Sequence, residues 1–577
     1  MEQASFGIAE ETCRAHRIVV SGEGEGAVLA TTVPLSFWGG LNPHTGEIVD
    51  GHHPLCGSHV SGRVLVMPFG RGSSSASGVL LEAIVNERAP SAILLSKVDE
   101  IIALGAIAAQ EIFARHIPLL VLDADTFEKA LRAVYAKVKA DGSVILQQQS
   151  LSSADMMGDL QLSERDRSLL AGAEGPARQT AMRILVRMAE LQGAPCFLDI
   201  QKAHIDGCIY TGEASLRFAE LLADLGGQVC VPTTMNAISI DQRRWRELGV
   251  DPDWAAMADR LAQAYVRMGA KPTFTCAPYQ LPGSPVFGEQ IAWAEYNAVV
   301  FANSVLGART NRYGDLMDIC AALTGRVPYA GYHLDENRRG TVLVELPDLG
   351  PVDSSFYPVL GYLIGGRVDT GVPVIAGLTG KPTPDDLKML GAAAATSGAV
   401  ALFHVVGVTP EAASLEEAFG GAEPQEVWKV TRDELADAWR RLSTARSGQI
   451  ELVALGNPHF SSDEFRQLAE LTKNKRKHSD VEVLITTSRH VHEEAMRSGA
   501  AEEIERFGAR VITDTCFCML QAPVIPEQAR TLMTNSAKYA HYAPGLVGRD
   551  IYFASLADCV QSAVAGQAVI SQPSWLA

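Results

Sequence analysis

Residues 451–455 read Glu-Leu-Val-Ala-Leu, and a polar loop, Gly-Asn-Pro-His, follows directly at 456–459. An amphipathic segment comes next, and the same order of apolar run, loop and amphipathic segment then returns. The further apolar runs are 481–486, 510–513, 531–534 and 550–553. This alternation is typical of a parallel β-sheet covered by helices. The sequence therefore predicts an α/β fold.

The loops that follow these predicted strands are chemically rich. In parallel sheets of this kind, ligands bind beyond the carboxyl ends of the strands. Several loops that hold Cys, His and Lys in register indicate a site, although loops are often polar for solvation alone. The side chains concerned are Asn457, His459, Ser488, Arg489, His490, Asp514, Cys516, Cys518, Asn535, Lys538, Tyr539 and His541.

The first 150 residues have a different sequence pattern. They contain two glycine-rich, β-prone stretches, then a strand, a helix and a strand, predicted at 22–33, 57–67, 92–95, 100–115 and 118–122. This order indicates a small mixed β domain with a βαβ unit. A polar stretch predicts a linker near residues 145–160. We therefore expect a small domain over 1–150 and a large domain over 160–577.

Three consecutive serines, Ser73, Ser74 and Ser75, occupy a glycine-flanked loop between an apolar run at 63–67 and a helical run at 79–86. A strand that stops at glycines and opens a helix leaves backbone N–H groups without intrahelical partners. These groups attract an anion or stabilise a serine alkoxide. The alternative is that Ser73 or Ser74 simply caps the helix.

Composition narrows the class of protein. The chain has 577 residues, of which 47% are hydrophobic, so it is long enough for more than one core. A formal net charge of −18 argues against a nucleic-acid surface. Residues 1–16 lack the apolar core of an export signal, and the small-residue stretch 391–410 indicates a buried helix followed by a strand. We expect a cytoplasmic protein without membrane spans.

Two further patterns are considered. The ten cysteines show neither disulfide-scaffold nor zinc-finger spacing, so we expect them to be reduced and mostly buried. Gly380-Lys381 suggests a phosphate-binding loop, but the upstream glycine is missing and Pro382 replaces the required Ser or Thr. That interpretation is rejected.

Six short motifs together resemble the aconitase X family, a branch of the aconitase superfamily. They are Lys-Ala-His-Ile-Asp-Gly at 202–207, Val-Pro-Thr-Thr-Met-Asn at 231–236, Pro-Thr-Phe-Thr-Cys-Ala-Pro-Tyr at 272–279, Ala-Asn-Ser-Val-Leu-Gly-Ala-Arg-Thr-Asn-Arg at 302–312, Thr-Asp-Thr-Cys at 513–516 and Lys-Tyr-Ala-His-Tyr-Ala-Pro-Gly at 538–545. The resemblance covers nearly the whole chain. It implies a large aconitase-like catalytic domain of parallel sheets with covering helices. The N-terminal part resembles the family's small swivelling β/β/α domain, which many relatives make as a separate subunit.

The resemblance also implies a reaction. Fused single-chain members are associated with dehydration of cis-3-hydroxy-L-proline to Δ1-pyrroline-2-carboxylate, whereas two-subunit members dehydrate mevalonate 5-phosphate. Fusion, and the lack of a basic cluster beyond what a carboxylate needs, favour the hydroxyproline substrate. We expect a hydro-lyase that acts on a small molecule, as a monomer, without nucleic-acid or membrane partners. A dehydratase of mevalonate 5-phosphate or another small hydroxy acid is the alternative.

Dehydration needs a base for the proton next to the carboxylate and a Lewis acid for the leaving hydroxide. In the wider superfamily the first serine of a Gly-Ser-Ser loop is the base, which implies Ser73 here, with Ser74 and Ser75 as alternatives. Arg71 is expected to neutralise the substrate carboxylate. The interpretation requires this loop to face a thiolate-bound metal across a cleft between the two domains.

The family implies an iron–sulfur cluster held by three cysteines. Cys276 and Cys516 are the two ligands expected. Two-subunit relatives tend to have a cysteine where this chain has Asn457, so we expect a [2Fe-2S] centre with another third ligand. Cys230 is the choice, with Cys518 and Cys320 as weaker alternatives.

The remaining predicted site residues lie in the same motifs or in the adjacent turn at 210–213. Lys538 is assigned to catalysis, against the alternative of a solvated lysine. His204 is expected to contact substrate or to be an interior histidine. The other predicted contacts are Ser75, Tyr210, Thr211, Asn311, Arg312 and Tyr539, with Arg309 as a further carboxylate partner. Two rival functions are considered. One is a hydrolase that uses Ser73 with His541 or His459, but the serine loop lacks the Gly-x-Ser-x-Gly motif. The other is a non-catalytic binding protein.

Overall fold

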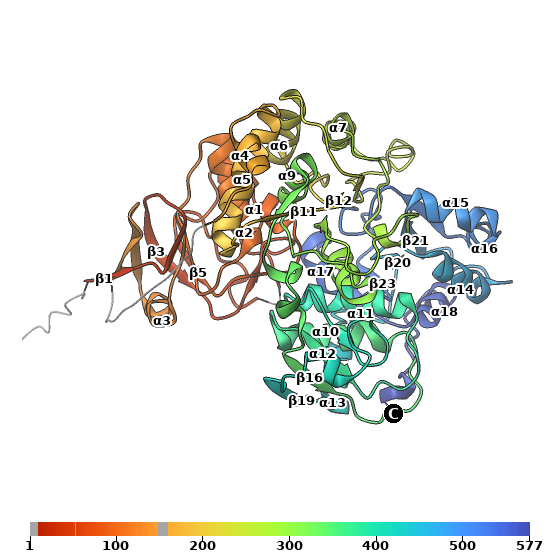
Figure 1. The fold of residues 1–577 in the computed structure, drawn as a ribbon. Helices are drawn as coiled ribbons and strands as arrows, with labels where there is room; N and C mark the ends of the chain where they lie inside the picture. The colour runs from red at the N-terminus through yellow and green to blue at the C-terminus, as the bar shows by residue number, and fades with distance from the viewer. Residues whose placement is uncertain (1–9, 52, 148–159, 577) are drawn as a thin grey trace, which may run out of the picture. The chain divides into compact units, whose positions relative to one another are not determined.

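The structure is a computed structural model that describes residues 10–51, 53–147 and 160–576 (Figure 1). The chain forms two compact units. Unit 1 covers the described residues up to Leu198, together with Thr211–Gly227 and Tyr313–Ala330. Unit 2 covers the rest. Most of the linker expected near residues 145–160 lies outside the described residues, and the domain bounds 1–150 and 160–577 stay a prediction.

Unit 1 contains an eight-stranded sheet in the order β1-β10-β9-β3-β5-β7-β8-β2. Four adjacent strands, β3 (Gly24–Ala30), β5 (Val64–Met67), β7 and β8, are parallel. The outer strands β1 (Glu10–Arg14), β10 (Ser143–Gln147), β9 (Tyr135–Val138) and β2 (Arg17–Val20) pair antiparallel. The βαβ unit expected from the sequence is present as β7, α2 and β8, which span Ala92–Leu95, Glu100–Phe113 and Leu119–Val121. The parallel strands β5, β7 and β8 are fully buried, as their continuous apolar runs require, whereas β3 is partly exposed.

The serine loop lies between β5 (Val64–Met67) and α1 (Ala76–Val85) of unit 1. Helix α2 packs closely against α1, because Gly105 lets it approach the backbone at Ser77. The N-cap of α2, Asp99, also accepts the Gly70 N–H at 2.6 Å. The start of the loop is therefore fixed by the neighbouring helix.

Later segments of the chain complete unit 1. Helices α5 (Pro176–Gln192) and α9 (Met317–Thr324) pack together, and α6 (Glu213–Asp224) packs on α1. Glu82 of α1 accepts the Ala214 N–H at 3.0 Å, so a buried carboxylate caps the first turn of α6.

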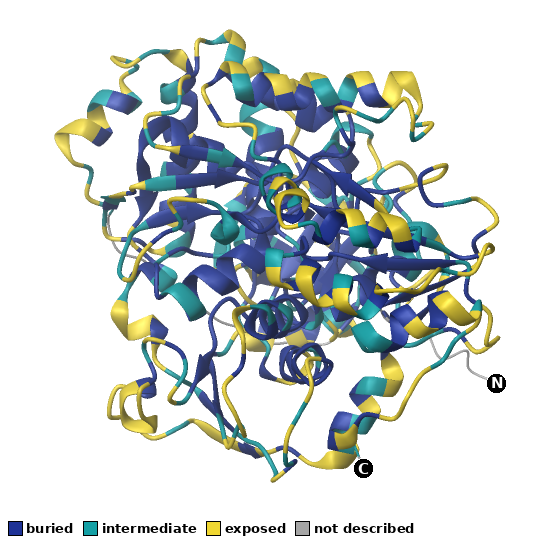
Figure 2. Cartoon of the chain, turned by 90° about the vertical axis from the view of Figure 1, so that its right-hand side faces the viewer, coloured by how far each residue is buried: buried dark blue, intermediate teal, exposed yellow. Residues whose placement is uncertain are grey.

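Unit 2 is built on three parallel sheets, in the orders β13-β12-β14, β18-β17-β16-β19 and β22-β21-β20-β23-β24. In the second sheet, β16 spans Val342–Glu345, β17 spans Pro373–Ala376 and β19 spans Glu426–Lys429. The five strands of the last sheet match the apolar runs predicted from the sequence to within one residue at each end. They are β20 (Leu452–Leu455), β21 (Glu482–Thr487), β22 (Arg510–Thr513), β23 (Thr531–Thr534) and β24 (Asp550–Phe553). Their interiors are buried. Figure 2 shows in dark blue the buried segments of the chain. The predicted α/β class is confirmed.

The middle of unit 2 contains two helices whose backbones nearly touch. They are α10 (Phe356–Val368) and α11 (Pro384–Ser397). At Gly361 an added Cβ would lie only 2.1 Å from the Leu390 carbonyl oxygen, so only glycine fits. The expected buried helix and strand over 391–410 are the end of α11 and β18 (His404–Val405). Within the described residues, no helix combines the length and apolar character that crossing a membrane requires.

Candidate active site

Three buried polar side chains lie just beyond the carboxyl ends of the sheet formed by β13 (Thr233–Met235), β12 (Lys202–Ile205) and β14 (Ile291–Trp293). They are Asp206, Asn236 and Glu295. Parallel pairing brings these strand ends to one edge. Asn236 Nδ2 donates to Asp206 Oδ1 and, at 3.0 Å, to Glu295 Oε2.

Glu295 forms a buried ion pair with Lys538. The Lys538 ammonium lies 3.0 Å from Glu295 Oε1, on the first turn of α17 (Ala537–Val547) after β23. Burial alone lowers the pKa of Lys538, but the Glu295 carboxylate raises it well above the usual value. Burial raises the pKa of Glu295, but Lys538 and the amides of Asn297 and Asn236 bring it below its ordinary value. Both groups are therefore charged at neutral pH.

Three thiols gather at the same edge of unit 2. Cys516 forms hydrogen-bonding contacts with both Cys276 and Cys518, and all three are buried. The contact with Cys276 and burial raise the pKa of Cys516. Cys276 also receives the His459 N–H at 3.3 Å, and Cys518 receives Asn457 Nδ2 at 3.1 Å. The Cys276 carbonyl accepts from Asn297 Nδ2 at 2.8 Å, which links the thiols to the Glu295 network.

Buried polar atoms without partners surround the thiols. Tyr539 Oη, Thr515 Oγ1 and Asn457 Oδ1 are buried and have no hydrogen-bond partner among the described residues. Within the same ranges, no three His, Cys, Asp or Glu side chains form a cage for a single ion. A chain of three thiols instead suits a multi-iron cluster, in which different thiolates bind different irons. The residues present therefore fit an iron–sulfur group.

The serine loop belongs to unit 1. Ser74 and Ser75 are buried, whereas Ser73 is only partly buried. Ser73 Oγ accepts the Ser75 N–H at 3.3 Å and lies 3.4 Å from Ser75 Oγ. Ser75 is the N-cap of α1, but its side chain makes no capping bond. Ser73 is thus the most accessible of the three hydroxyls, at the amino end of a helix.

Arg71 precedes this loop and already has an acidic partner. Its Nη2 lies 2.8 Å from Asp50 Oδ2, and both side chains are largely buried. Arg71 Nε is buried and has no hydrogen-bond partner among the described residues. The ion pair means that Arg71 does not present a free positive charge.

Comparison with known proteins gives family matches along nearly the whole chain. Family models match four consecutive segments: the aconitase X swivel domain at 14–147, first domain at 159–336, second domain at 340–440 and third domain at 450–565. The chain belongs to the aconitase X family.

Relatives of this aconitase X chain carry two activities in their names. Cis-3-hydroxy-L-proline dehydratase of Pseudomonas aeruginosa is 54% identical, over 97% of this chain and 98% of its own length. The Hypocrea jecorina protein of the same name is 48% identical, over 96% of each chain. The phosphomevalonate dehydratase large subunit of Methanothermobacter thermautotrophicus is 39% identical, over 69% of this chain and 97% of its own.

A solved aconitase X structure supports the fold. The holo-form crystal structure of Thermococcus kodakaraensis aconitase X superposes with a TM-score of 0.64 at 34% identity. The match covers 70% of this chain and 100% of that one.

The third thiol of this aconitase X chain differs from the expected one. Cys230 is exposed and precedes the amino end of β13. The loop of Cys276 instead contacts the carboxyl end of β13, where the Thr275 N–H donates to Met235 O. The position of Cys230 therefore favours Cys518 as the third ligand, and the choice of Cys230 stays a prediction. Cys518 joins them, through a turn closed by the Met519 N–H on Cys516 O at 2.9 Å and not through an extended segment. Cys320 is buried in α9 of unit 1.

His204 has the surroundings of an interior histidine. It is fully buried, its Nδ1 lies 2.7 Å from Thr234 Oγ1, and its ring tilts against Trp293 at 5.9 Å. Burial lowers its pKa to about 3, so the ring is neutral. Its Nε2 is buried and has no hydrogen-bond partner among the described residues, so the choice between a neutral substrate contact and an interior histidine stays open.

The predicted carboxylate contacts at 309–312 are engaged within unit 2. Asn311 Oδ1 accepts the Tyr332 N–H at 2.6 Å. Arg312 lies 4.6 Å above the Tyr296 ring, and Arg309 pairs with Asp335. Arg309 is therefore already neutralised.

Two further predicted contacts fall in different units. Tyr210 of unit 2 packs edge-on against Trp254 at 4.9 Å. Thr211 belongs to unit 1, and its Oγ1 is buried without a partner among the described residues. Both assignments as substrate contacts stay predictions.

The Glu295 network was missed at the level of the sequence. Glu295, Asn236 and Asn297 were not among the candidates, although Asn236 follows β13 directly and Glu295 and Asn297 come shortly after the apolar strand β14. The rule that selected the loops after the last five strands would have found them, had it been applied to β13 and β14.

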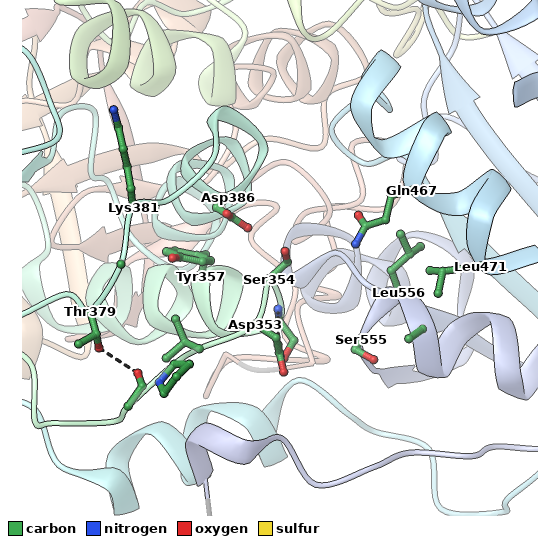
Figure 3. Close-up of a pocket in the computed structure, with 16 residues that line it drawn as sticks. Asp353, Ser354, Tyr357, Thr379, Lys381, Asp386, Gln467, Leu471, Ser555 and Leu556 are labelled. Carbon is green, nitrogen blue, oxygen red and sulfur yellow. Dashed lines mark hydrogen bonds between the residues drawn. The ribbon is translucent and has the colours of Figure 1, made fainter. Parts of the chain in front are cut away.

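Unit 2 also contains a cavity of about 680 Å³, which is lined in part by Asp353, Ser354, Lys381, Gln467 and Ser555 (Figure 3). No predicted site residue lines it. The rejected Gly380-Lys381 motif does, and the adjacent Thr379 donates to Gly350 O at 2.9 Å. Acidic side chains share this lining, so the position of Lys381 does not revive a phosphate-binding interpretation.

Proposed function

We propose that this protein is a hydro-lyase that dehydrates cis-3-hydroxy-L-proline to Δ1-pyrroline-2-carboxylate. The observation that carries the proposal is the near-full-length identity of 54% and 48% to two dehydratases named for that substrate. Relatives named as large subunits of phosphomevalonate dehydratase are 30–39% identical over 62–70% of this chain, and one named as the small subunit is 46% identical over only 16% of it. They make a dehydratase of mevalonate 5-phosphate the second candidate.

The charges around the thiols favour a substrate with one carboxylate. Lys538 is paired with Glu295, and Arg489 is paired with Asp514. A phosphate dianion needs several cations that are free to approach it, because each brings only one positive charge. A single carboxylate makes a smaller demand. Lys538 is paired, as Arg71 and Arg309 are, but it lies near the three thiols and its ammonium has two further N–H donors.

An iron–sulfur cluster, of the [2Fe-2S] type, is proposed as the cofactor. Cys276, Cys516 and Cys518 would hold it, with Cys518 in place of Cys230. When bound, it supplies the Lewis acid that the departing hydroxide requires. Asn457 would lie beside the cluster, because its Nδ2 donates to Cys518 Sγ at 3.1 Å. Tyr539 Oη and Thr515 Oγ1 are the donors near the thiols that have no other partner among the described residues.

Ser73 is proposed as the base that removes the proton next to the carboxylate. The Ser75 N–H already donates to its oxygen, and such a donor stabilises an alkoxide more than a hydroxyl. One well-placed donor of this kind contributes about 3 kcal/mol. The buried Ser74 and Ser75 are less suited because their oxygens are less accessible.

Lys538 is proposed to bind the substrate carboxylate. Glu295 keeps its ammonium protonated and fixes its position, so that its remaining donors can be directed at the substrate. Arg71 is assigned to the support of the serine loop, because its charge is satisfied by Asp50. The monomeric state and the cytoplasmic location remain predictions.

An activity assay tests the proposal. The purified, anaerobically reconstituted protein is incubated with cis-3-hydroxy-L-proline, its trans isomer or mevalonate 5-phosphate, and products are followed by NMR. We expect turnover of the cis amino acid alone. Turnover of mevalonate 5-phosphate alone would establish the second candidate, and inactivity on all three would contradict both.

A further inference from the structure

The two loops that carry Cys276 and Cys516 share an unusual backbone feature. Phe274 has a φ of +44° and Asp514 has a φ of +69°. Each lies two residues before its thiol. Residues other than glycine rarely adopt such angles, least of all a bulky one such as Phe, unless their surroundings hold them there. Something around these loops must therefore fix both positions.

Arg489 contacts both of these residues. It is the first residue of α15 (Arg489–Arg497), directly after β21. Its Nε and Nη2 donate to the two carboxylate oxygens of Asp514, each at 2.6 Å. Its guanidinium also lies 5.1 Å from the ring centroid of Phe274. One planar group thus links the two strained positions.

The partner of Arg489 is not a surface carboxylate. The Asp514 side chain is fully buried, and its Oδ2 also accepts the Gln242 N–H at 3.1 Å. A surface ion pair contributes little, but a bidentate pair with a buried carboxylate fixes geometry as well as charge. Lysine cannot reproduce this arrangement, because its ammonium offers neither a flat face nor a fork of two parallel donors.

His459 links the same loops one residue nearer to the thiols. Its Nδ1 lies 3.2 Å from Thr275 Oγ1, and its Nε2 lies 2.8 Å from Thr515 O. Thr275 and Thr515 directly precede Cys276 and Cys516. The loops are therefore joined twice, at positions one and two residues before the thiols.

We infer that Arg489 and His459 are positioning residues that hold the loops 274–276 and 514–516 in register, so that the two thiols are presented to one centre. The inference deepens the proposed function, because it assumes that these thiols bind the cluster. It assigns neither side chain a contact with substrate. Outer groups that orient metal ligands typically change metal retention about 10- to 100-fold when they are removed.

Arg489→Lys and Arg489→Met test the inference. Arg326→Lys is a matched control, because Arg326 donates from Nε and Nη2 to buried Asp166 of unit 1 at 2.9 and 3.2 Å. Two rates are measured: iron loss from the loaded protein to a chelator, and iodoacetamide alkylation of Cys276 and Cys516 in the iron-free protein, by mass spectrometry. We expect both rates to rise at least about tenfold in the Arg489 variants, without rescue by lysine, and to stay unchanged in the control.

Wild-type rates in Arg489→Lys would overturn the inference, as would equal changes in Arg326→Lys. If Arg489→Met does not fold, Phe274→Leu replaces it, since leucine keeps the apolar contact but removes the ring under the guanidinium. Faster alkylation of Cys276 in Phe274→Leu supports the inference, and an unchanged rate contradicts it. The alkylation experiment needs neither cluster nor substrate. If the wild-type protein bound no iron, the proposed cofactor would be refuted. The alkylation rates would still show whether Arg489 holds the loops.

Discussion

The serine loop of unit 1 and the thiol loops of unit 2 are held in opposite ways. Ser73 is partly exposed, and its Oγ contacts the backbone N–H and the hydroxyl of nearby Ser75. The thiols are buried and tied to distant segments through His459, Asn457 and Arg489. A group that gives and takes a proton must remain accessible, whereas ligands of a cluster must be fixed before it binds. The two halves of the proposed reaction thus demand different kinds of structure.

The largest effect is expected from Cys516→Ser. Cys516 is the middle thiol, in contact with both others, so its loss should remove the cluster and all measurable turnover. Visible absorbance, EPR and iron content under anaerobic conditions measure the outcome. Cys559→Ser is the control, because Cys559 is a buried thiol packed in the core of the last sheet. A coloured, iron-replete Cys516→Ser protein would contradict the ligand assignment.

Ser73→Ala should separate the two regions. We expect turnover to fall by about a hundredfold to ten-thousandfold while the absorbance and iron content stay unchanged, because only the base is lost. Ser77→Ala is the control, since Ser77 lies in the first turn of α1 and its Oγ serves structure by accepting the Asp315 N–H at 3.1 Å and donating to Ser74 O at 3.0 Å. Full activity in Ser73→Ala would move the role of base to Ser74 or elsewhere.

Lys538→Met should affect both activity and stability. It leaves the Glu295 carboxylate buried without its charge partner, which costs about 3–5 kcal/mol of unfolding free energy. Adding Glu295→Gln should recover much of this stability but none of the activity. Urea unfolding and turnover measure the two effects. Recovery of turnover in the double variant would show that Lys538 does not act on the substrate.

The smallest effect concerns acid sensitivity. His333 is buried, and burial lowers its pKa to about 3, so it stays neutral in the fold but takes up a proton on unfolding below about pH 6.5. A depressed folded pKa means that its stabilisation is complete above pH 6.5 and is lost as the pH falls. At pH 5.5 the loss is about 1.4 kcal/mol. His333→Gln should remove that loss relative to pH 8 in urea unfolding, and an unchanged pH dependence would contradict it.

The sequence predicted the parts that depend on local pattern. The five strands of the last sheet are continuous apolar runs, because parallel strands are buried on both faces, and their limits were predicted to within one residue. The serine loop was found for a similar reason, since glycines and serines mark the change from strand to helix. The polar loops were singled out because ligands bind beyond the carboxyl ends of parallel strands.

The parts that depend on tertiary structure were not predictable in this way. Cys230 and Cys518 are both beside plausible motifs, and only the packing of β13 shows that Cys230 lies at the wrong end of its strand. The pairing of Glu295 with Lys538 joins residues 243 positions apart. Nor does a linear pattern reveal that residues 211–227 and 313–330 belong with the N-terminal strands in one compact unit.

The glycine contact between α10 and α11 affects the thiol site from a distance. Gly361 presses on the backbone of Leu390, and two residues earlier Lys388 bridges Asp385 and Glu464 and lies 3.5 Å from the His459 carbonyl oxygen. A single methyl group at position 361 would push α11 away and shift the lysine that supports the His459 loop. Substitutions of Gly361 would then be limited by loss of iron, although this glycine touches no ligand. Genetic screens for oxygen-sensitive variants should therefore recover changes at position 361.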